Sequence, residues 1–453
     1  MELVTIILAA GKGTRMKSAL PKVLHKVAGA PMLKHVLTAA KSAGAKRNIV
    51  ITGFGADEVE KTLAGEAEFV RQAEQLGTGH AVRQAENTLS GVRGTALILC
   101  GDTPLLTGDV LRDLLAEHEK TGAKATVLTA MLPDSTGYGR IVRQADGSVA
   151  KIVEEKDCSP AERQIKEVNS GIYCFALPEL FAVLAQVTND NAQGEYYLPD
   201  VLDILRRQGE KISATAVADS RMILGINSRR QLAVAEKILR ERKNNELMDA
   251  GVTIMDPATT FIDSTVQIGR DTVVYPFTWI EGDTVIGENC EVGPGARLQN
   301  VTLADGVKGQ FYYAHDAIIE NDVNLGQYVH IRPNTHLMSG VKIGNFVEVK
   351  NSVVGENTKL PHLSYIGDSD IGSGVNMGCG TITVNYDGKK KFRTVIGNNA
   401  FIGCNSNLVA PVTVEDNAYV GAGSTITKDV PTNNLAIARS RQTNYDNWVD
   451  KRK

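Results

Sequence analysis

The sequence predicts two different folds in one chain, an α/β domain followed by a parallel β-helix. Residues 1–228 alternate apolar, strand-like runs with segments of helical spacing, which favours a mostly parallel sheet with helices on both faces. From Ile262 onward, an aliphatic residue recurs at every sixth position, a period that belongs to neither a helix nor a simple strand and marks a repeat. A chain of 453 residues also exceeds what one core usually serves.

The elements of the first domain follow from apolar runs and helical spacing. We expect strands at Leu3–Leu8, Asn48–Thr52, Ala96–Cys100 and Lys124–Met131. We expect helices between them at Met32–Ala43, Thr78–Leu89 and Val110–Lys120. Ligands of such sheets bind at the carboxyl ends of the strands, so candidate site residues should lie there.

The repeat of the second domain has three features. The aliphatic series runs through Ile262, Ile268, Val274, Ile280, Ile286, Val292 and Leu298, returns at Leu325–Val349, and returns again at Ile396–Ile426. Small residues lie two positions earlier, and residues two apart on a strand share a face, so both should point inward. Glycine often follows the aliphatic residue, as at Gly269, Gly344, Gly397 and Gly403, where a corner would need backbone freedom. Three such strands close a triangular coil; antiparallel strands spaced six apart by chance are the remote alternative.

Composition excludes several classes of protein. A formal net charge of −3 with 22% charged residues gives no field that would favour nucleic acid or an anionic membrane. No apolar run approaches the roughly 18 residues of a transmembrane helix, and the opening MELVTIILAAGKG reads as a strand entering a loop, not as a signal peptide. Six scattered cysteines show no zinc or disulfide spacing. We therefore expect a cytoplasmic enzyme without membrane insertion.

A glycine-rich loop follows the first strand. It reads Leu8-Ala9-Ala10-Gly11-Lys12-Gly13-Thr14-Arg15-Met16, then Pro21-Lys22. Glycines let the backbone approach a pyrophosphate, whose charge Arg15 and Lys22 can offset. The loop lacks the Lys-Ser/Thr of a Walker motif and the third glycine of the dinucleotide fingerprint. The whole string resembles the signature of sugar-nucleotide pyrophosphorylases, although a Gly-x-Gly alone could be a simple turn.

Further strings narrow the resemblance. They are Gln72–Ala81, Gly101-Asp102, Gly137–Arg140, Val153-Glu154, Asn169–Gly171 and Gly225–Asn227. Taken together, the chain resembles the bacterial bifunctional N-acetylglucosamine-1-phosphate uridyltransferase/glucosamine-1-phosphate acetyltransferases over essentially its whole length. The resemblance implies a Rossmann-like nucleotidyltransferase domain at 1–228, a helical linker at 229–250 and a left-handed hexapeptide-repeat β-helix at 251–453. It also implies a homotrimer with acetyl sites between subunits, feeding peptidoglycan and other envelope polymers.

The first predicted site joins a uridine nucleotide to a sugar phosphate. Asp102, at the end of a strand, is a candidate Mg²⁺ ligand from its position, with a helix cap or turn as the alternative; the resemblance adds Asn227 as the second metal ligand. It further implies that Arg15 and Lys22 act in catalysis by offsetting phosphate charge. The residues it implies for UTP and N-acetylglucosamine 1-phosphate are Leu8, Ala9, Ala10, Gly11, Lys22, Gln72, Gly77, Thr78, Cys100, Gly101, Asp102, Gly139, Glu154, Asn169 and Asn227. We expect His80 to pack at the start of its helix instead.

The second predicted site lies on the β-helix. The repeat is interrupted between Leu298 and Leu325 and between Met377 and Ile396, and the second gap holds the polar excursion Thr383–Arg393; a polar excursion is often functional, although a solvated tip is the alternative. Coil packing does not require Arg332, Glu348, Lys350, His362, Tyr365 or Asn376. Acetyl transfer from a thioester to an amine needs a base, and histidine titrates in the right range.

The resemblance assigns roles to these residues. It implies His362 as the general base, where a structural histidine is the alternative, and Arg332, Lys350, Tyr365 and Asn376 as ligands of glucosamine 1-phosphate. The implied acetyl-CoA residues are Cys379, Asn385, Tyr386, Cys404, Ala422 and Arg439. Relatives usually carry alanine and serine in place of Cys379 and Cys404, and because both replacements are small we expect the site to be kept without side-chain contacts there.

Two rival hypotheses remain. One is a single-function pyrophosphorylase whose β-helix serves oligomerisation or regulation; the residues around His362 argue against it. The other is a nucleotide-sugar sensor built on an inactive pyrophosphorylase, which the intact Arg15, Lys22 and Asp102 disfavour. The linker, a basic helix with a modest apolar stripe, reads as a solvated connection and not as a nucleic-acid surface.

Overall fold

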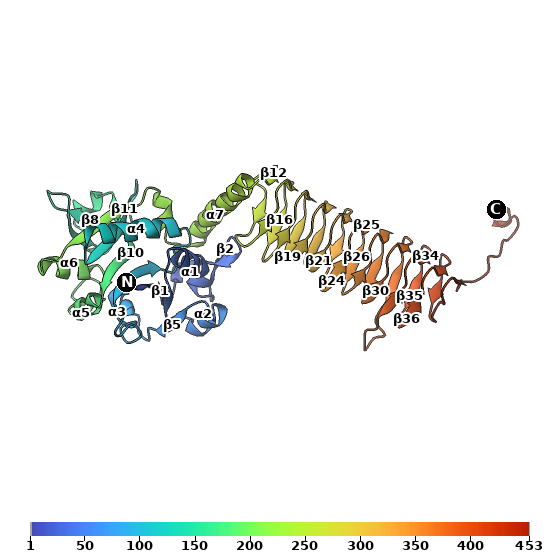
Figure 1. Ribbon diagram of the computed structural model, residues 1–453, viewed down its shortest axis with the longest axis horizontal. Coiled ribbons are helices and arrows are strands. Elements are labelled where there is room, and N and C mark those ends of the chain that lie inside the picture. The colour runs from blue at the N-terminus through green and yellow to red at the C-terminus, as the bar shows by residue number, and fades with distance from the viewer. Residues whose placement is uncertain (1, 453) are drawn as a thin grey trace. The chain divides into compact units, whose positions relative to one another are not determined.

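The computed structural model describes residues 2–452, and its chain forms two compact units (Figure 1). The units are Met1–Leu239 and Arg240–Lys453. The boundary between them falls inside helix α7 (Arg229–Asp249). None of the helices within residues 2–452 has the length and hydropathy needed to cross a membrane.

The first unit is built on one nine-stranded sheet of order β11-β7-β10-β6-β1-β4-β5, with β8 and β9 attached through β10. Its strands are β1 (Glu2–Ala9), β4 (Arg47–Thr52), β5 (Glu68–Arg71), β6 (Gly94–Cys100), β7 (Ala125–Met131), β8 (Arg140–Arg143), β9 (Val149–Val153), β10 (Glu167–Leu177) and β11 (Ile212–Ala216). β1 runs parallel to β4 and β6, whereas β10 runs antiparallel to β6 and β7. A small hairpin of β2 (Lys26–Val27) and β3 (Ala30–Pro31) lies outside this sheet.

Alternating side chains of the sheet feed two separate cores. Val4 and Ile6 of β1 join the core beneath α3 (Thr78–Arg83), α5 (Glu179–Leu184) and α6 (Asp200–Arg207). Ile7 joins the opposite core, beneath α1 (Met32–Ser42), α2 (Ala56–Thr62) and α4 (Gly108–Thr121). Helices therefore cover both faces, as the alternation predicted. The helix expected at Thr78–Leu89 ends at Arg83, after which the hydrogen bonds shift to a three-residue spacing.

The second unit stacks coils of three parallel strands, visible in Figure 1 as repeated arrows. We call the three sides face one, face two and face three. Strands on one side pair with strands 18 residues later, as Val273 does with Glu291, so each strand accounts for six residues. The predicted six-residue repeat is therefore confirmed as three strands to a coil.

The strands distribute over the faces as follows. Face one holds β12 (Thr253–Ile254), β15 (Val273–Val274), β18 (Glu291–Val292), β20 (Lys308–Gly309), β22 (Asn324–Leu325), β25 (Lys342–Asn345), β28 (Lys359–His362), β31 (Asn376–Met377), β34 (Phe401–Ile402), β37 (Tyr419–Val420) and β39 (Leu435–Ala436). Face two holds β13 (Phe261–Ile262), β16 (Trp279–Glu281), β23 (His330–Ile331), β26 (Glu348–Lys350), β29 (Tyr365–Gly367), β32 (Ile382–Val384), β35 (Asn407–Val409) and β38 (Thr425–Ile426). Face three holds β14 (Gln267–Ile268), β17 (Val285–Ile286), β24 (Thr335–Leu337), β27 (Val353–Val354), β30 (Ser369–Ile371), β33 (Thr394–Ile396) and β36 (Val412–Val414). β19 (Arg297–Leu303) and β21 (Tyr313–Ile319) run across faces two and three.

The coil interior explains the small residues of the repeat. Ile280 and Leu298 are fully buried, and so are Thr278, Thr284 and Cys290 at the small positions. The glycines after the aliphatic residues need a different explanation from the one expected. A Cβ at Gly344 would lie 1.7 Å from the carbonyl oxygen of Pro361 in the next coil, so glycine is needed there for close stacking. Positive φ angles fall instead mainly on other corner residues, such as Asn289 and Asn334, because asparagine tolerates that conformation.

The two interruptions of the repeat differ in kind. At the first, the pairing offset shortens from 18 residues to 17 and then 16, as Glu291 pairs with Lys308 and Lys308 with Asn324. At the second, Ser369 pairs with Thr394, an offset of 25 residues. The second interruption is therefore an inserted segment, and it carries the predicted polar excursion.

Candidate functional site

The loop after β1 is shaped around Lys22. Gly13 has φ 59°, and a Cβ at that position would lie 2.6 Å from the Cβ of Lys22. Glycine is therefore needed both for the left-handed backbone and for the close approach of the lysine stem. Arg15, in the short 3₁₀ turn Thr14–Met16, is exposed and lines neither cavity described below.

Three predicted residues converge at the edge of the sheet. The Lys22 Nζ lies 2.5 Å from Asp102 Oδ2 and 3.0 Å from Asn227 Oδ1. Asp102 follows β6, and the Ile226 N–H donates to the Asp102 carbonyl at 2.9 Å, which brings the segment before α7 alongside. Residues 80 and 205 positions from Lys22 in sequence thus surround one ammonium group.

Two adjoining cavities open at the carboxyl ends of the strands, and Leu8, Thr78 and Cys100 line both. The first, of about 310 Å³, is lined by Leu8, Ala9, Ala10, Gly11, Lys22, Val23, Gln72, Gln75, Gly77, Thr78, Ala81, Cys100, Asp102 and Glu195. The second, of about 200 Å³, is lined by Leu8, Thr78, Cys100, Gly137, Tyr138, Gly139, Glu154, Asn169, Ser170, Gly171, Tyr173, Leu198 and Pro199. The first collects most of the residues predicted for the nucleotide, and the second collects Gly139, Glu154 and Asn169. We call them the nucleotide cavity and the sugar cavity.

Hydrogen bonds orient the amide side chains of both cavities. In the nucleotide cavity, the Gln72 Nε2 donates to the Gly77 carbonyl at 3.2 Å and lies 3.0 Å from His80 Nδ1. In the sugar cavity, the Tyr173 hydroxyl and the Gly171 N–H donate to Asn169 Oδ1 at 2.9 and 3.0 Å. Asn169 would therefore meet a ligand with its amide N–H groups, and Gln72 with its carbonyl oxygen.

Burial sets the charges of the cavity walls. Burial, and then the carboxylates of Asp157, Asp200 and Glu195, raise the pKa of Glu154. Burial raises the pKa of Cys100 to about 12, and its thiol lies 3.6 Å from the Gly171 carbonyl oxygen. Cys100 therefore presents an uncharged thiol to both cavities.

Two oxygen ligands at the edge of the cavities could hold a metal ion. Within residues 2–452, no group of three or more His, Cys, Asp or Glu side chains could hold a metal ion. Mg²⁺, however, usually takes one or two protein oxygens together with substrate phosphates. Asp102 Oδ2 and Asn227 Oδ1 already converge on one cation, the Lys22 ammonium. A carboxylate and an amide oxygen so placed fit the requirements of Mg²⁺.

On the β-helix, face two carries part of the second predicted site. Glu348 and Tyr365 lie in register on successive coils, and Arg332 forms an ion pair with Glu348 at 2.7 Å. Lys350 follows on the same strand as Glu348, one coil before the Tyr365 strand. Arg332, Lys350 and Tyr365 are thus brought together on one side, whereas Asn376 lies on face one.

The corner between faces one and two carries a column of the remaining residues. Lys359 pairs with Asn376, which sets His362 beside Cys379 at the corner, and Met377 pairs with Ile402, which sets Cys379 beside Cys404. Backbone hydrogen bonds continue this stacking, because the Asn405 N–H donates to the Cys379 carbonyl and the Gly423 N–H to the Cys404 carbonyl. Ala422 precedes Gly423 at the same corner, and Arg439 passes near it. His362 and Cys404 are both exposed.

The inserted segment is an ordered hairpin. Tyr386 and Lys391 form an antiparallel bridge, and the Asp387 carboxylate accepts from the N–H groups of Lys389 and Lys390 at 2.7 and 2.6 Å. At its base, the Asn385 Nδ2 lies 3.4 Å from the Tyr365 hydroxyl. The predicted acetyl-CoA residue and the predicted sugar-phosphate residue are therefore neighbours.

Some residues at the sites have no sequence signal of their own. Contact with the Lys391 ammonium, and then burial, lower the pKa of Lys350, so Lys391 adds a second cation beside it. Glu195 and Tyr173 line the cavities of the first unit without belonging to any recognised string. The sequence predicted the hairpin that carries Lys391 as a polar excursion. It did not predict that the hairpin would bring Lys391 beside Lys350.

Comparisons with known proteins agree with this geometry. Residues 5–195 match the family model of the MobA-like NTP transferase domain. Residues 265–307 and 393–428 match the model of the bacterial transferase hexapeptide (six repeats). With the parallel three-strand coils, the second match fits a left-handed β-helix. The class is thus a nucleotidyltransferase domain joined to a hexapeptide-repeat transferase domain, which confirms the predicted fold class.

Full-length relatives identify the family. The chain is 53% identical over 451 residues to the bifunctional protein GlmU of Caldanaerobacter subterraneus subsp. tengcongensis, covering 100% of this chain and 98% of that protein. It is 53% identical over 446 residues to the same-named protein of Geobacillus sp. strain WCH70, covering 98% and 97%, and 53% identical over 438 residues to that of Exiguobacterium sibiricum, covering 97% and 98%. The chain belongs to the GlmU family of bifunctional enzymes.

Proposed function

We propose that this protein makes UDP-N-acetylglucosamine in two steps, acetylating glucosamine 1-phosphate on its β-helix and uridylating the product in its α/β unit. The observation that carries the proposal is the pair of adjoining cavities with Lys22, Asp102 and Asn227 at their edge, on the same chain as the His362 corner. Such a product, made in the cytoplasm, would feed peptidoglycan and other envelope polymers.

In uridyl transfer, a phosphate oxygen of N-acetylglucosamine 1-phosphate attacks the α-phosphorus of UTP and pyrophosphate leaves. Catalysis of this kind consists mainly of alignment and charge neutralisation. Lys22 and Arg15 offset phosphate charge, Gln72 and Thr78 face the nucleotide, and Glu154 and Asn169 face the sugar. Asp102 and Asn227 would hold Mg²⁺, which when bound neutralises charge on the triphosphate.

In acetyl transfer, the amino group of glucosamine 1-phosphate attacks the thioester carbonyl of acetyl-CoA. His362 takes the proton that the amine releases, the C–N bond forms, and the C–S bond breaks to give coenzyme A. Arg332, Lys350 and Tyr365 hold the phosphate, with Lys391 as a further cation, and Asn376 completes the set. Cys379, Asn385, Tyr386, Cys404, Ala422 and Arg439 hold acetyl-CoA.

The active assembly is proposed to be a homotrimer with each acetyl site between subunits. Support comes from the exposed side chains of Phe401 and Tyr419, 40% and 52% exposed, which stack on face one in line with Asn376. Such a stripe is typical of a surface that another chain covers. Molar mass in solution measured by light scattering tests this point.

One experiment tests both activities. The enzyme is supplied with glucosamine 1-phosphate, acetyl-CoA, UTP and Mg²⁺, and products are followed by mass spectrometry. UDP-N-acetylglucosamine should form, should disappear when acetyl-CoA is omitted, and should return when N-acetylglucosamine 1-phosphate is supplied instead. Uridylation of N-acetylglucosamine 1-phosphate without any acetylation would leave a single-function pyrophosphorylase.

A further inference from the structure

A buried carboxylate lies beneath the acetyl site, and none of the roles assigned above uses it. Asp368 follows β29 at the corner between faces two and three and is only 6% exposed. Its backbone has φ 50°, and its N–H donates to the Lys350 carbonyl at 3.0 Å. A buried carboxylate costs free energy unless hydrogen bonds compensate it, so its partners define its role.

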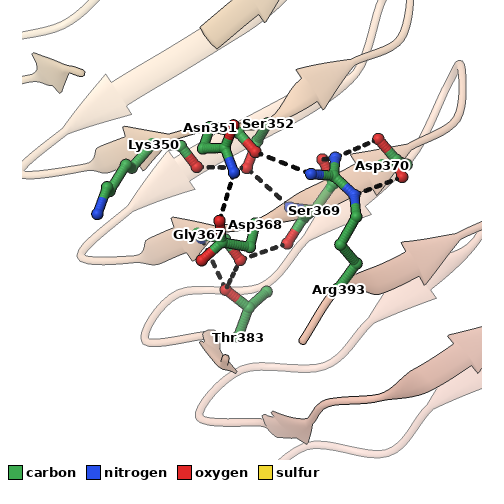
Figure 2. A network of polar contacts seen from close by, with 9 residues as sticks. All are labelled: Lys350, Asn351, Ser352, Gly367, Asp368, Ser369, Asp370, Thr383 and Arg393. Atoms are coloured by element: carbon green, nitrogen blue, oxygen red, sulfur yellow. Dashed lines mark hydrogen bonds and ion pairs between the residues drawn. The ribbon is translucent and has the colours of Figure 1, made fainter. Parts of the chain in front are cut away.

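Both carboxylate oxygens of Asp368 accept from asparagine amides. The Asn351 Nδ2 donates to Oδ1 at 2.5 Å, from the preceding coil (Figure 2). The Asn385 Nδ2 donates to Oδ2 at 2.5 Å, from the following coil. Asn385 is itself 7% exposed. One carboxylate therefore ties three successive coils together at the point where the hairpin leaves the rod.

The contact with Asn385 fixes the base of the hairpin. The Asn385 carbonyl accepts from the Phe392 N–H at 2.9 Å, so the two arms of the hairpin close directly above this residue. The returning arm is held separately at the base, because the Arg393 guanidinium pairs with Asp370 and donates to the Ser369 carbonyl at 3.1 Å, as Figure 2 shows. Asp368 is thus the buried anchor and Asp370 the exposed one.

The same carboxylate acts on the cations of the site. Contact with the Lys391 ammonium, burial and the charge of Arg332 lower the pKa of Lys350, and the Asp368 carboxylate opposes that shift. Two ammonium groups held side by side suit a phosphate dianion, but they repel each other until it arrives. A nearby carboxylate reduces that repulsion.

We propose that Asp368 is a positioning residue for acetyl transfer. Its one buried carboxylate orders both the acetyl-CoA side and the sugar-phosphate side of the site. Through Asn385 it orders the acetyl-CoA side, and through the hairpin it places Lys391 beside Lys350 on the sugar-phosphate side. The inference rests on the proposed acetyltransferase function of the β-helix.

The Asp368→Asn variant tests this role. Asparagine keeps the size and tolerates the left-handed backbone. The side-chain amide of the new asparagine has an NH₂ group in place of one carboxylate oxygen. That NH₂ group would face the NH₂ group of Asn351 or Asn385, and one hydrogen bond would be lost. Losing one charge-assisted hydrogen bond should raise KM for both acetyl-CoA and glucosamine 1-phosphate about tenfold. We expect kcat to change by less than about threefold, because His362 ends β28 at the corner between faces one and two, whereas Asp368 lies at the next corner.

Proteolysis supplies a readout that does not depend on activity. Lys389, Lys390 and Lys391 are exposed in the hairpin, and trypsin cleaves there only as fast as the hairpin opens. Asp368→Asn should speed that cleavage about tenfold, in line with the lost hydrogen bond. The double variant Asp368→Asn with Asn385→Asp restores a donor opposite an acceptor. It should recover resistance to trypsin while KM for acetyl-CoA stays raised.

Asp370→Asn is the matched control. It makes the same change two residues away, in an exposed pair with Arg393 whose side chains are 48% and 43% exposed. An exposed ion pair contributes little, and Arg393 also donates to the carbonyls of Asn351 and Ser369. KM and the rate of cleavage at Lys389–Lys391 should therefore stay within about twofold of the wild type. If Asp368→Asn loses the melting transition of the β-helix, Asn385→Ala removes the same contact from the hairpin side and the cleavage rate decides.

The outcomes separate the two proposals. A wild-type enzyme that does not acetylate glucosamine 1-phosphate overturns the proposed function. A wild type that acetylates, together with an Asp368→Asn variant that matches Asp370→Asn in both KM and cleavage rate, overturns the positioning role. The positioning role is supported if Asp368→Asn raises both KM values and speeds cleavage, and if the double variant restores the slow cleavage.

Discussion

The two proposed sites of this chain differ in how the fold makes them. The first is recessed in two cavities at the carboxyl ends of β1 and β6, where distant segments converge on the Lys22 ammonium. The second lies on the outside of a rod, where Tyr365 and Glu348 are placed by coil register and His362 is exposed at a corner. Burial shifts the pKa values of Glu154 and Cys100 in the first site. In the recessed site, desolvation therefore shifts the pKa values of the side chains. On the β-helix, the repeat of the coils sets the spacing of the side chains.

The strongest test of this contrast is Asp102→Ala. Removing the carboxylate takes away a proposed Mg²⁺ ligand and the partner of Lys22, so uridyl transfer should fall by at least about 100-fold, the upper effect of losing even an outer-shell partner of a metal. Acetyl transfer should stay near normal. Both rates are measured on the same preparation with saturating substrates.

Asp109→Ala serves as the control, since Asp109 is an exposed residue of α4 paired with Arg112. Equal loss of both activities in a folded Asp102→Ala protein would contradict independent sites.

His362→Ala probes the rod in the same way. Acetyl transfer should fall by about 10²–10⁴-fold, the usual contribution of a positioned general base, and the decline in rate on the acid side should flatten. Binding of acetyl-CoA, measured by calorimetry, should change little, and uridyl transfer should be untouched. His336→Ala on face three is the matched control. A His362→Ala variant with the full acetylation rate and an unchanged pH profile would make this histidine structural.

Thiol labelling distinguishes the sites by accessibility. Cys404 is exposed, whereas Cys100 is partly enclosed and burial raises its pKa to about 12, so little of its reactive thiolate exists near neutral pH. One equivalent of a maleimide should modify Cys404 first and block acetyl transfer while sparing uridyl transfer. Acetyl-CoA should protect the thiol, and Cys404→Ser should be resistant. A labelled enzyme with normal acetylation would place Cys404 outside the acetyl-CoA site.

What the sequence predicted reflects the same contrast. The six-residue repeat specified the coils because its period is local, and the strand-end motifs located the Asp102 side of the first site. The role of Asn227 beside Asp102 came from family resemblance alone, and its contact with Lys22, 205 positions away, was not predicted. Asp368 gave no signal, because a corner aspartate resembles the many Asn and Asp residues that tolerate positive φ. Its role depends on contacts with the coils before and after it, and the six-residue repeat of the sequence does not reveal such contacts.

The smallest expected effect concerns Asp200, one of the carboxylates that act on Glu154 in the first unit. Burial, followed by the charges of Asp203 and Asp157, raises the pKa of Asp200 to about 6 from its ordinary 3.8. A raised carboxyl pKa means that the folded state favours the protonated form, so this stabilisation is complete below about 3.8 and is lost as pH rises through about 6. Asp200→Asn keeps the uncharged form at every pH. It should therefore raise the melting midpoint of the α/β unit at pH 7.5, by an amount that shrinks on acidification and vanishes near pH 4. Scanning calorimetry across this range checks the trend, with the transition of the β-helix as the internal reference. An Asp200→Asn protein that melts with the wild type at every pH would show that solvent screens this carboxyl, and burial would be the wrong explanation for its environment.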